Sequence, residues 1–189
     1  MQPPHGGFLF FIFLHLTSLI SSLMKAFIAF GSNVEDRINY ILKAIELLQP
    51  CGKILKISTI YESAPWGVSQ QPSFLNGVLL LETSFDPIKL LFCLKDVERL
   101  AGRRERYRWG PREIDLDIIL YENNILFLSF LTIPHPYMTE RDFVLVPLLE
   151  LDPNLQHPIT RVPLEDYLKK LKVNLKPFAC LYPPVSSGH

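Results

Sequence analysis

The order of apolar segments in this chain predicts an α+β fold in which helices pack on an antiparallel sheet. Short runs rich in β-branched and aromatic residues alternate with longer segments whose apolar residues recur every three or four positions. Gly, Pro, Asn and Asp residues separate these segments, as expected for turns. With 189 residues, of which 48% are hydrophobic, the chain can build one domain with a substantial core.

Four segments have the composition and length of strands. They are residues 25–30, 53–61, 74–83 and 114–120. The third is apolar along nearly its whole length, which is typical of a strand covered on both faces. Asn76 is the polar residue within it, and a buried Asn is satisfied either by nearby backbone or by a ligand.

Two helices are predicted between these strands. The first ends at about residue 48, and Ser32 or Asn33 could cap its start. The second begins at Asp86, where Pro87 occupies the favoured first-turn position, and ends at Gly102. The resulting order of strand, helix, strand, strand, helix, strand predicts a ferredoxin-like (βαββαβ) antiparallel sheet.

C-terminal additions follow this unit. They are an apolar segment at 125–132, a short helix at 143–150, an amphipathic helix at 163–172 and a loosely ordered tail at 173–189. Residues 1–23 precede the fold, and the apolar run 8–23 is short for a membrane span and has no Lys or Arg before it. We interpret 1–23 as an extension upstream of the true start, the alternative being a targeting or membrane segment. The predicted domain is 24–172.

The charge balance limits the class of partner. Lys and Arg total 19, as do Asp and Glu, so no overall field favours nucleic acid or an anionic membrane. Cys51, Cys93 and Cys180 are odd in number and lack CxxC spacing, which predicts free thiols in a reducing compartment. We therefore expect a cytoplasmic protein, monomeric or weakly dimeric, that binds small molecules and neither nucleic acid nor membrane.

Residues 103–117 form the main candidate functional stretch of the chain. Their sequence is RRERYRWGPREIDLD, in which arginines precede two aspartates. If 114–120 is a strand, Asp115 and Asp117 point to the same face. Two adjacent carboxylates suit Mg²⁺, which takes one or two carboxylates together with substrate phosphates. The arginines before them are planar donors that match phosphate oxygens. The stretch therefore predicts a magnesium-nucleotide site.

Plainer interpretations of these residues exist. The arginines could pair with Glu98, Glu105 and Glu113, although surface pairs contribute only about 0–1 kcal/mol each. Trp109 could belong to the core or could stack on a flat heterocycle. His135, between two prolines, could be structural or could contact phosphate.

The sequence motifs resemble those of the 6-hydroxymethyl-7,8-dihydropterin pyrophosphokinases of folate biosynthesis. The motifs are AFIAFGSN at 26–33, the loop 61–67, QPSFLNGV at 71–78, ERLAGR at 98–103, RWGPREIDLDIIL at 108–120 and LTIPHPYMTERDFVLVPLLEL at 131–151. The resemblance implies transfer of the diphosphate of ATP to the hydroxymethyl group of the reduced pterin, with release of AMP. It also implies two Mg²⁺ ions on Asp115 and Asp117.

The resemblance further implies roles for individual residues. Those expected to act in catalysis are Arg103, Arg112, Asp115 and Asp117. Those expected to bind ATP are Glu98, Arg103, Arg112, Ile118, Thr132, His135 and Arg141. Those expected to bind the pterin are Ser63, Ala64, Trp66, Phe74, Asn76, Trp109 and Phe143.

Some positions depart from the family pattern, and two rival functions stay open. Lys95 and Phe130 stand where the family usually has Gln and a basic residue, and either Arg104 or Arg106 could be the second loop arginine that contacts ATP. One rival is a magnesium-dependent transferase acting on another alcohol. The other is a sheet that binds RNA through residues 103–109, which would require an excess of basic residues that the charge count does not show.

Overall fold

The computed structural model describes residues 22–66, 70–104 and 110–181, and its centre is an antiparallel sheet. The strands are β1 (Met24–Ser32), β2 (Lys53–Ile57), β3 (Thr59–Ser63), β4 (Phe74–Thr83), β5 (Asp115–Tyr121) and β8 (Lys176–Cys180). Their order is β5-β1-β4-β3-β8, and β2 also pairs with β4. β6 (Leu126–Phe127) and β7 (Thr132–Ile133) form a separate pair. The predicted α+β class with an antiparallel sheet is confirmed.

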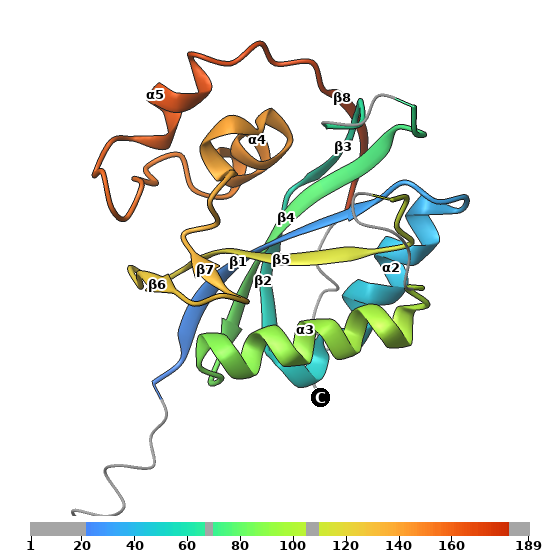
Figure 1. Ribbon diagram of the computed structural model, residues 1–189, viewed down its shortest axis with the longest axis horizontal. Helices are drawn as coiled ribbons and strands as arrows, with labels where there is room; N and C mark the ends of the chain where they lie inside the picture. The colour runs from blue at the N-terminus through green and yellow to red at the C-terminus, as the bar shows by residue number, and fades with distance from the viewer. Residues whose placement is uncertain (1–21, 67–69, 105–109, 182–189) are drawn as a thin grey trace, which may run out of the picture.

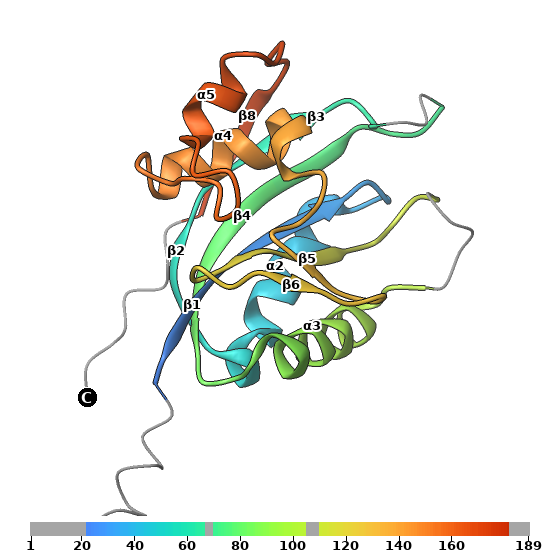
Figure 2. The ribbon, with the colours of Figure 1, turned by 60° about the vertical axis from the view of Figure 1, so that its left-hand side comes forward.

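Helices cover both faces of the sheet (Figures 1 and 2). α2 (Arg37–Leu47) and α3 (Pro87–Ala101) lie on one face, and α4 (Asp142–Leu151) and α5 (Leu164–Leu168) lie on the other. The side chains of β1 alternate between the two: Ile28 packs with the α2 and α3 side, whereas Phe27 packs with the α4 side. Both faces of the central strands are therefore buried.

The start and end of α3 follow the predicted signals. The Asp86 side chain accepts hydrogen bonds from the backbone N–H groups of Ile88 and Lys89, and Pro87 is the first helical residue. Gly102 ends the helix with a φ of 117°, a conformation that favours glycine. The predicted cap of α2 is wrong, because the helix begins at Arg37 after Asp36, and Asn33 makes other bonds.

The second predicted strand is two strands. Ser58 interrupts it, and its buried hydroxyl accepts a hydrogen bond from the Val78 N–H and donates one to the Thr59 carbonyl. A side chain that bonds the backbone in this way competes with the regular ladder, which explains why β2 ends before β3 begins.

Three C-terminal predictions need adjustment. The apolar segment 125–132 forms only the short strands β6 and β7, and the helix expected at 163–172 is limited to Leu164–Leu168. The tail expected to be loosely ordered contributes β8, which pairs with β3. An edge strand of this kind needs an exposed partner strand, which the local sequence cannot indicate. α4 extends one residue beyond each end of the predicted helix.

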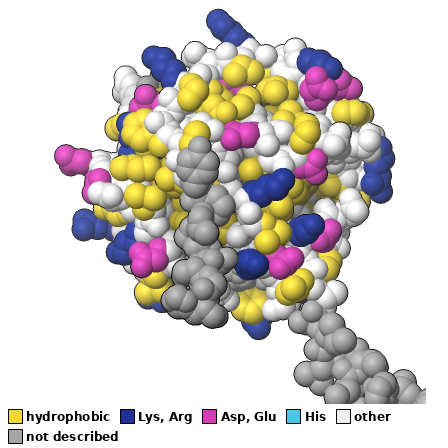
Figure 3. Space-filling view, turned by 180° about the vertical axis from the view of Figure 1, so that it is seen from behind, with side chains coloured by type: hydrophobic (Ala, Val, Ile, Leu, Met, Phe, Trp, Pro, Cys, Tyr) yellow, Lys and Arg dark blue, Asp and Glu magenta, His cyan; other side chains and the backbone are white. Residues whose placement is uncertain are grey.

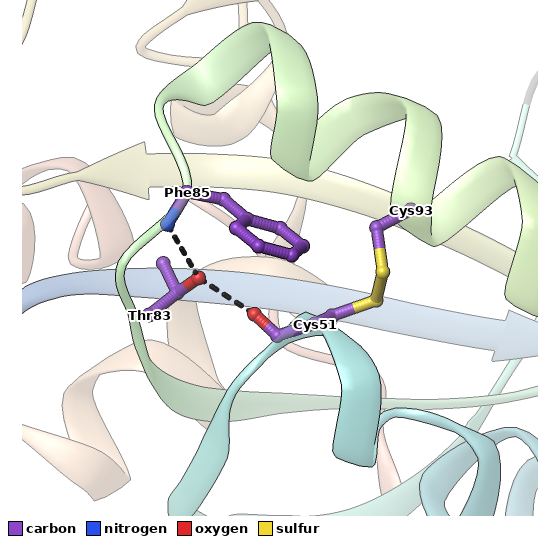
Figure 4. Close-up of a disulfide and its surroundings, with 4 residues drawn as sticks. All are labelled: Cys51, Thr83, Phe85 and Cys93. Atoms are coloured by element: carbon purple, nitrogen blue, oxygen red, sulfur yellow. Dashed lines mark hydrogen bonds between the residues drawn. A yellow bond between two sulfur atoms is a disulfide. The ribbon is translucent and has the colours of Figure 1, made fainter.

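Cys51 and Cys93 form a disulfide, so the prediction of free thiols is wrong for this pair (Figure 4). Cys51 ends the short 3-10 helix after α2, and Cys93 lies on α3. Because these two helices pack against each other, their cysteines meet with Cα atoms 5.8 Å apart. Thr83 donates a hydrogen bond to the Cys51 carbonyl beside the disulfide. Cys180 is free and exposed.

The surface carries mixed charge. On the face opposite to that of Figure 1, basic and acidic side chains lie among apolar ones, with no large area of one sign (Figure 3). Within the described residues, no helix has both the length and the apolar character needed to cross a bilayer.

Candidate active site

A pocket opens on the α4 side of the sheet, where β1, β4 and β5 meet the loop after β3 and the start of α4. It brings together most of the predicted site residues. Those that line it are Ser63, Ala64, Trp66, Phe74, Asn76, Arg112, Asp115, Asp117, Arg141 and Phe143. Glu98, Arg103, Ile118, Thr132 and His135 are not among the lining residues. Trp109 and Arg106 lie outside the described residues.

Asp115 and Asp117 share one face of β5, as the alternation along a strand predicts. On the neighbouring strand β1 their partners are Gly31 and Ala29, respectively. These small residues leave room over the carboxylates. A Cβ atom on Gly31 would also lie 2.8 Å from Asn76 Oδ1, so glycine is needed there to admit the Asn76 side chain.

The Asp115 carboxylate is surrounded by cations. Arg103 Nη1 lies 2.6 Å from Asp115 Oδ1, and Arg112 pairs with Oδ2. Burial alone would raise the pKa of Asp115, but the charges of Arg112 and Arg103 outweigh burial and lower it. Asp115 is therefore an anion that holds two guanidinium groups in place.

Asp117 has a different environment. Among the described residues, the cation that pairs with it is Lys95, whose Nζ lies 4.0 Å from Oδ1. Burial, together with the negative charge of Asp115, raises the pKa of Asp117 to about 6. A cation placed beside this carboxylate would favour its ionised form.

The two carboxylates fit a hard divalent cation in part. Both offer oxygen ligands to one pocket, and Mg²⁺ typically takes one or two carboxylates and completes its shell with phosphates and water. The described residues contain no group of three or more His, Cys, Asp and Glu side chains arranged to bind a metal. Phosphate or water ligands would thus have to complete a magnesium site on Asp115 and Asp117.

Glu98 lies beneath the site and supports it. Its buried carboxylate accepts hydrogen bonds from Lys95 Nζ and the Leu116 N–H, both at 2.7 Å, and pairs with Arg103. Burial raises the pKa of Glu98, against the effect of Lys95. Glu98 thereby ties α3 to β5 and orients Arg103 toward Asp115.

Ser63 and Asn76 form the opposite wall of the pocket. Asn76 Nδ2 donates a hydrogen bond to Ser63 Oγ at 2.8 Å, across the paired strands β3 and β4. The pair is buried and fixed, so the Asn76 amide has a defined orientation. Phe74 and Phe143 add aromatic rings to this wall. The combination of rings and an amide suits a flat heterocycle with its own amide edge.

Three further predicted ATP-binding residues do not line the pocket: Ile118, Thr132 and His135. The Ile118 side chain packs in the core on the α2 and α3 side, and Thr132 begins β7. The His135 N–H donates to the Ile119 carbonyl, and its Nδ1 accepts from the Tyr137 N–H. Burial, and then the charge of Arg141, lower the pKa of His135 to about 4. His135 is therefore neutral near pH 7.

Sequence reasoning missed several residues of the site. Gln71 and Gly31 line the pocket, and Tyr137 contacts Arg141. Asn33 was assigned only as a possible cap, yet its Nδ2 donates to Gln71 Oε1 and its Oδ1 accepts from the Arg112 N–H. The signal for Asn33 was its position directly after a strand that ends at the site.

The comparisons with known proteins concern the family of the chain. The family model of 7,8-dihydro-6-hydroxymethylpterin-pyrophosphokinase (HPPK) matches residues 27–153. A 2-amino-4-hydroxy-6-hydroxymethyldihydropteridine pyrophosphokinase of Aquifex aeolicus is 51% identical over 159 residues, which cover 84% of this chain and 98% of the relative. The enzyme of the same name from Bacillus subtilis is 42% identical over 128 residues, which cover 67% of this chain and 77% of that enzyme.

Longer proteins also match. The Folic acid synthesis protein fol1 of Schizosaccharomyces pombe is 45% identical over 77% of this chain, which spans only 20% of that protein. A crystal structure of Plasmodium falciparum HPPK-DHPS has the same fold, with a TM-score of 0.67 at 17% identity, over 81% of this chain and 45% of that one. On the evidence of the family model and the Aquifex relative, this chain belongs to the 7,8-dihydro-6-hydroxymethylpterin pyrophosphokinase family.

Proposed function

We propose that this chain transfers the diphosphate of ATP to 6-hydroxymethyl-7,8-dihydropterin, giving the pterin diphosphate and AMP in folate synthesis. The observation that carries the proposal is the meeting of two unlike walls in one pocket. The carboxylates of β5 and their arginines form one wall, and the Ser63–Asn76 pair with its aromatic neighbours forms the other. Family membership supplies the substrates.

The reaction moves one diphosphate group. The pterin hydroxymethyl oxygen attacks the β-phosphorus of ATP, the bond from that phosphorus to the α-phosphate oxygen breaks, and AMP leaves. The hydroxyl proton goes to solvent. Such a transfer depends mainly on positioning and on neutralising charge, which are what this pocket offers.

Asp115 and Asp117 would hold two Mg²⁺ ions, which when bound neutralise the triphosphate and polarise the attacking hydroxyl. Arg112 and Arg103, kept in place by Asp115, are suited to face the phosphates. Asn76 would bind the amide edge of the pterin, between the rings of Phe74 and Phe143. Trp66, Ala64 and Ser63 would complete the pterin side.

Three broader expectations accompany this function. The order β5-β1-β4-β3 and the helices between these strands support a ferredoxin-like topology. Small-molecule substrates, with neither nucleic acid nor membrane as a partner, agree with the mixed surface charge in Figure 3. A cytoplasmic monomer or weak homodimer is our proposal for the state of the protein in the cell; it does not rest on free thiols, since Cys51 and Cys93 form a disulfide.

Replacement of Asp117 tests the site. Asp117→Asn keeps the shape of the side chain and removes its charge, so we expect release of AMP from ATP and hydroxymethyl-dihydropterin to fall by at least about 100-fold. Asp96→Asn is the matched control, because Asp96 is exposed on α3 and pairs with Arg99. Turnover of the Asp117 variant near the unmutated rate would reject the carboxylate assignment.

Calorimetry tests the substrates. A non-hydrolysable ATP analogue with Mg²⁺ is titrated first, and 6-hydroxymethyl-7,8-dihydropterin follows. We expect saturable binding of both in a one-to-one ratio. Absence of pterin binding after the nucleotide would reject the proposed substrate.

A further inference from the structure

The Arg141 side chain is held by aromatic rings. Its guanidinium carbon lies 4.4 Å from the centre of the Trp66 ring, 5.1 Å from that of Tyr137 and 5.8 Å from that of Phe143. Trp66 and Tyr137 also contact each other, with ring centres 5.6 Å apart. The rings come from the loop after β3, the residue before the second 3-10 helix, and the first turn of α4. The Arg141 guanidinium thus contacts rings from separate segments of the chain.

Arg141 has no ion pair within the described part of the chain. Arg103 and Arg112 are paired with Asp115, and Lys95 is paired with Glu98. The Arg141 Nε atom is buried and has no hydrogen-bond partner. Burial also lowers the pKa of Arg141, against the pull of Asp117 and Asp115. An arginine that contacts rings while its buried Nε–H group has no partner among the described residues is incompletely satisfied.

The geometry of the guanidinium group explains why Arg141 can bind an anion while it contacts aromatic rings. Aromatic rings attract the cation, but they do not replace the in-plane hydrogen bonds that its N–H groups make with anions. Arg141 lines the pocket together with Trp66 and Phe143. An anion in the pocket could therefore bond the N–H groups while the rings keep the side chain in place.

We propose that Trp66 is a positioning residue for Arg141: its indole holds the guanidinium ready for the phosphates of the nucleotide. This inference rests on the proposed function, because it takes ATP as the anion. Trp66 would thereby affect nucleotide binding through Arg141, in addition to any contact with the pterin. Trp66 is the nearest of the three rings, and it belongs to the loop that forms the pocket wall.

Nucleotide affinity measured without pterin tests the proposal. The probe is a non-hydrolysable ATP analogue with Mg²⁺, titrated calorimetrically into the full chain. We expect Trp66→Leu to weaken binding about tenfold, as loss of one good cation–π contact implies. Trp66→Phe should restore most of the affinity, because a ring returns to the same place. Phe127→Leu is the control, since Phe127 is an exposed aromatic residue outside the pocket.

A double-mutant cycle with Arg141 decides whether Trp66 acts through it. Arg141→Met should weaken nucleotide binding, and adding Trp66→Leu should then have no further effect. Additive losses, an affinity of Trp66→Leu within twofold of the unmutated protein, or an effect on pterin binding alone would each overturn the proposal. If the unmutated protein bound no nucleotide, the proposed function would fail; if it bound normally and Trp66→Leu did too, only this inference would fail.

Discussion

Asn33 and Arg112 are joined by two hydrogen bonds at the edge of the pocket. The Asn33 N–H donates to the Arg112 carbonyl at 3.0 Å, and the Asn33 Oδ1 accepts from the Arg112 N–H at 2.7 Å. The Asn33 Nδ2 donates on the other side to Gln71 Oε1 at 3.0 Å and to the Pro72 carbonyl at 3.4 Å. One buried amide therefore links the segments on either side of the site.

This relationship predicts separate effects for two substitutions of Asn33. Asn33→Asp can still accept from Arg112 but cannot donate to Gln71, so we expect a higher KM for the pterin with a smaller change in kcat. Asn33→Leu loses the side-chain bonds to both Arg112 and Gln71, so Arg112 is no longer held in place. We therefore expect kcat to fall as well, by about 100-fold if Arg112 moves by about 1 Å. Steady-state kinetics of both variants give the measurement. Asn39→Leu, on the exposed side of α2, is the control. Identical kinetics for Asn33→Asp and Asn33→Leu would contradict this division.

Replacement of Glu98 should destabilise the fold and lower activity together. Glu98→Leu removes a buried anion that bonds Lys95, Arg103 and the Leu116 N–H, and leaves an unsatisfied buried N–H. We expect a loss of about 2–4 kcal/mol in the free energy of unfolding, measured with urea. Glu98→Gln keeps an acceptor for the Leu116 N–H and should lose less. Equal stability of the Leu variant and the unmutated protein would show that the anion is dispensable.

Reduction of the disulfide should lower stability. The Cys51–Cys93 bond closes a loop with a sequence separation of 42 residues, for which the chain-entropy model gives about 4 kcal/mol. A reductant, or the double replacement by Ala, should therefore shift urea unfolding to lower concentration, whereas Cys180→Ala should not. Alkylation of the unfolded chain followed by mass measurement counts the thiols: we expect one without reductant and three with it. Three labelled thiols in the untreated protein would rule out the bond.

Acid should destabilise the protein through His135. The pKa of His135 is about 4 in the folded chain, below its ordinary value of 6.5, so between these pH values the unfolded chain binds a proton that the folded chain does not. This contribution to the free energy of unfolding is lost as the pH falls from 6.5 to 4, by up to about 3 kcal/mol, and is unaffected above 6.5.

His135→Asn isolates that contribution. The Asn oxygen can replace Nδ1 as acceptor for the Tyr137 N–H, but it does not titrate in this range. Urea unfolding at pH 7 and pH 4.5 should show a smaller loss for the variant than for the unmutated protein. His157→Asn serves as comparison, because the His157 Nδ1 also accepts backbone N–H bonds but His157 lies outside the site. Parallel pH profiles for the His135 variant and the unmutated protein would exclude His135 as the source.

The local sequence determined the ends of α3 and the face of the reactive strand. Asp86, Pro87 and Gly102 place the ends of α3 through capping bonds and backbone conformation, which are local properties. Alternation along a strand puts Asp115 and Asp117 on one face whatever lies opposite. The motifs around these residues also sufficed to identify the family, and the family model confirms it.

The tertiary structure decided which of these residues meet. The Cys51–Cys93 bond exists because the 3-10 helix after α2 packs against α3, and β8 is a strand because β3 offers it an edge. Glu98 supports the site from below, whereas Trp66, Tyr137 and Phe143 surround Arg141 from three segments. Contacts between segments far apart in the chain depend on how the helices and strands pack, whereas caps and alternation depend only on neighbours. For this reason the caps and the shared face of the two aspartates could be predicted from the sequence, whereas the disulfide, β8 and the contacts of Arg141 required the tertiary structure.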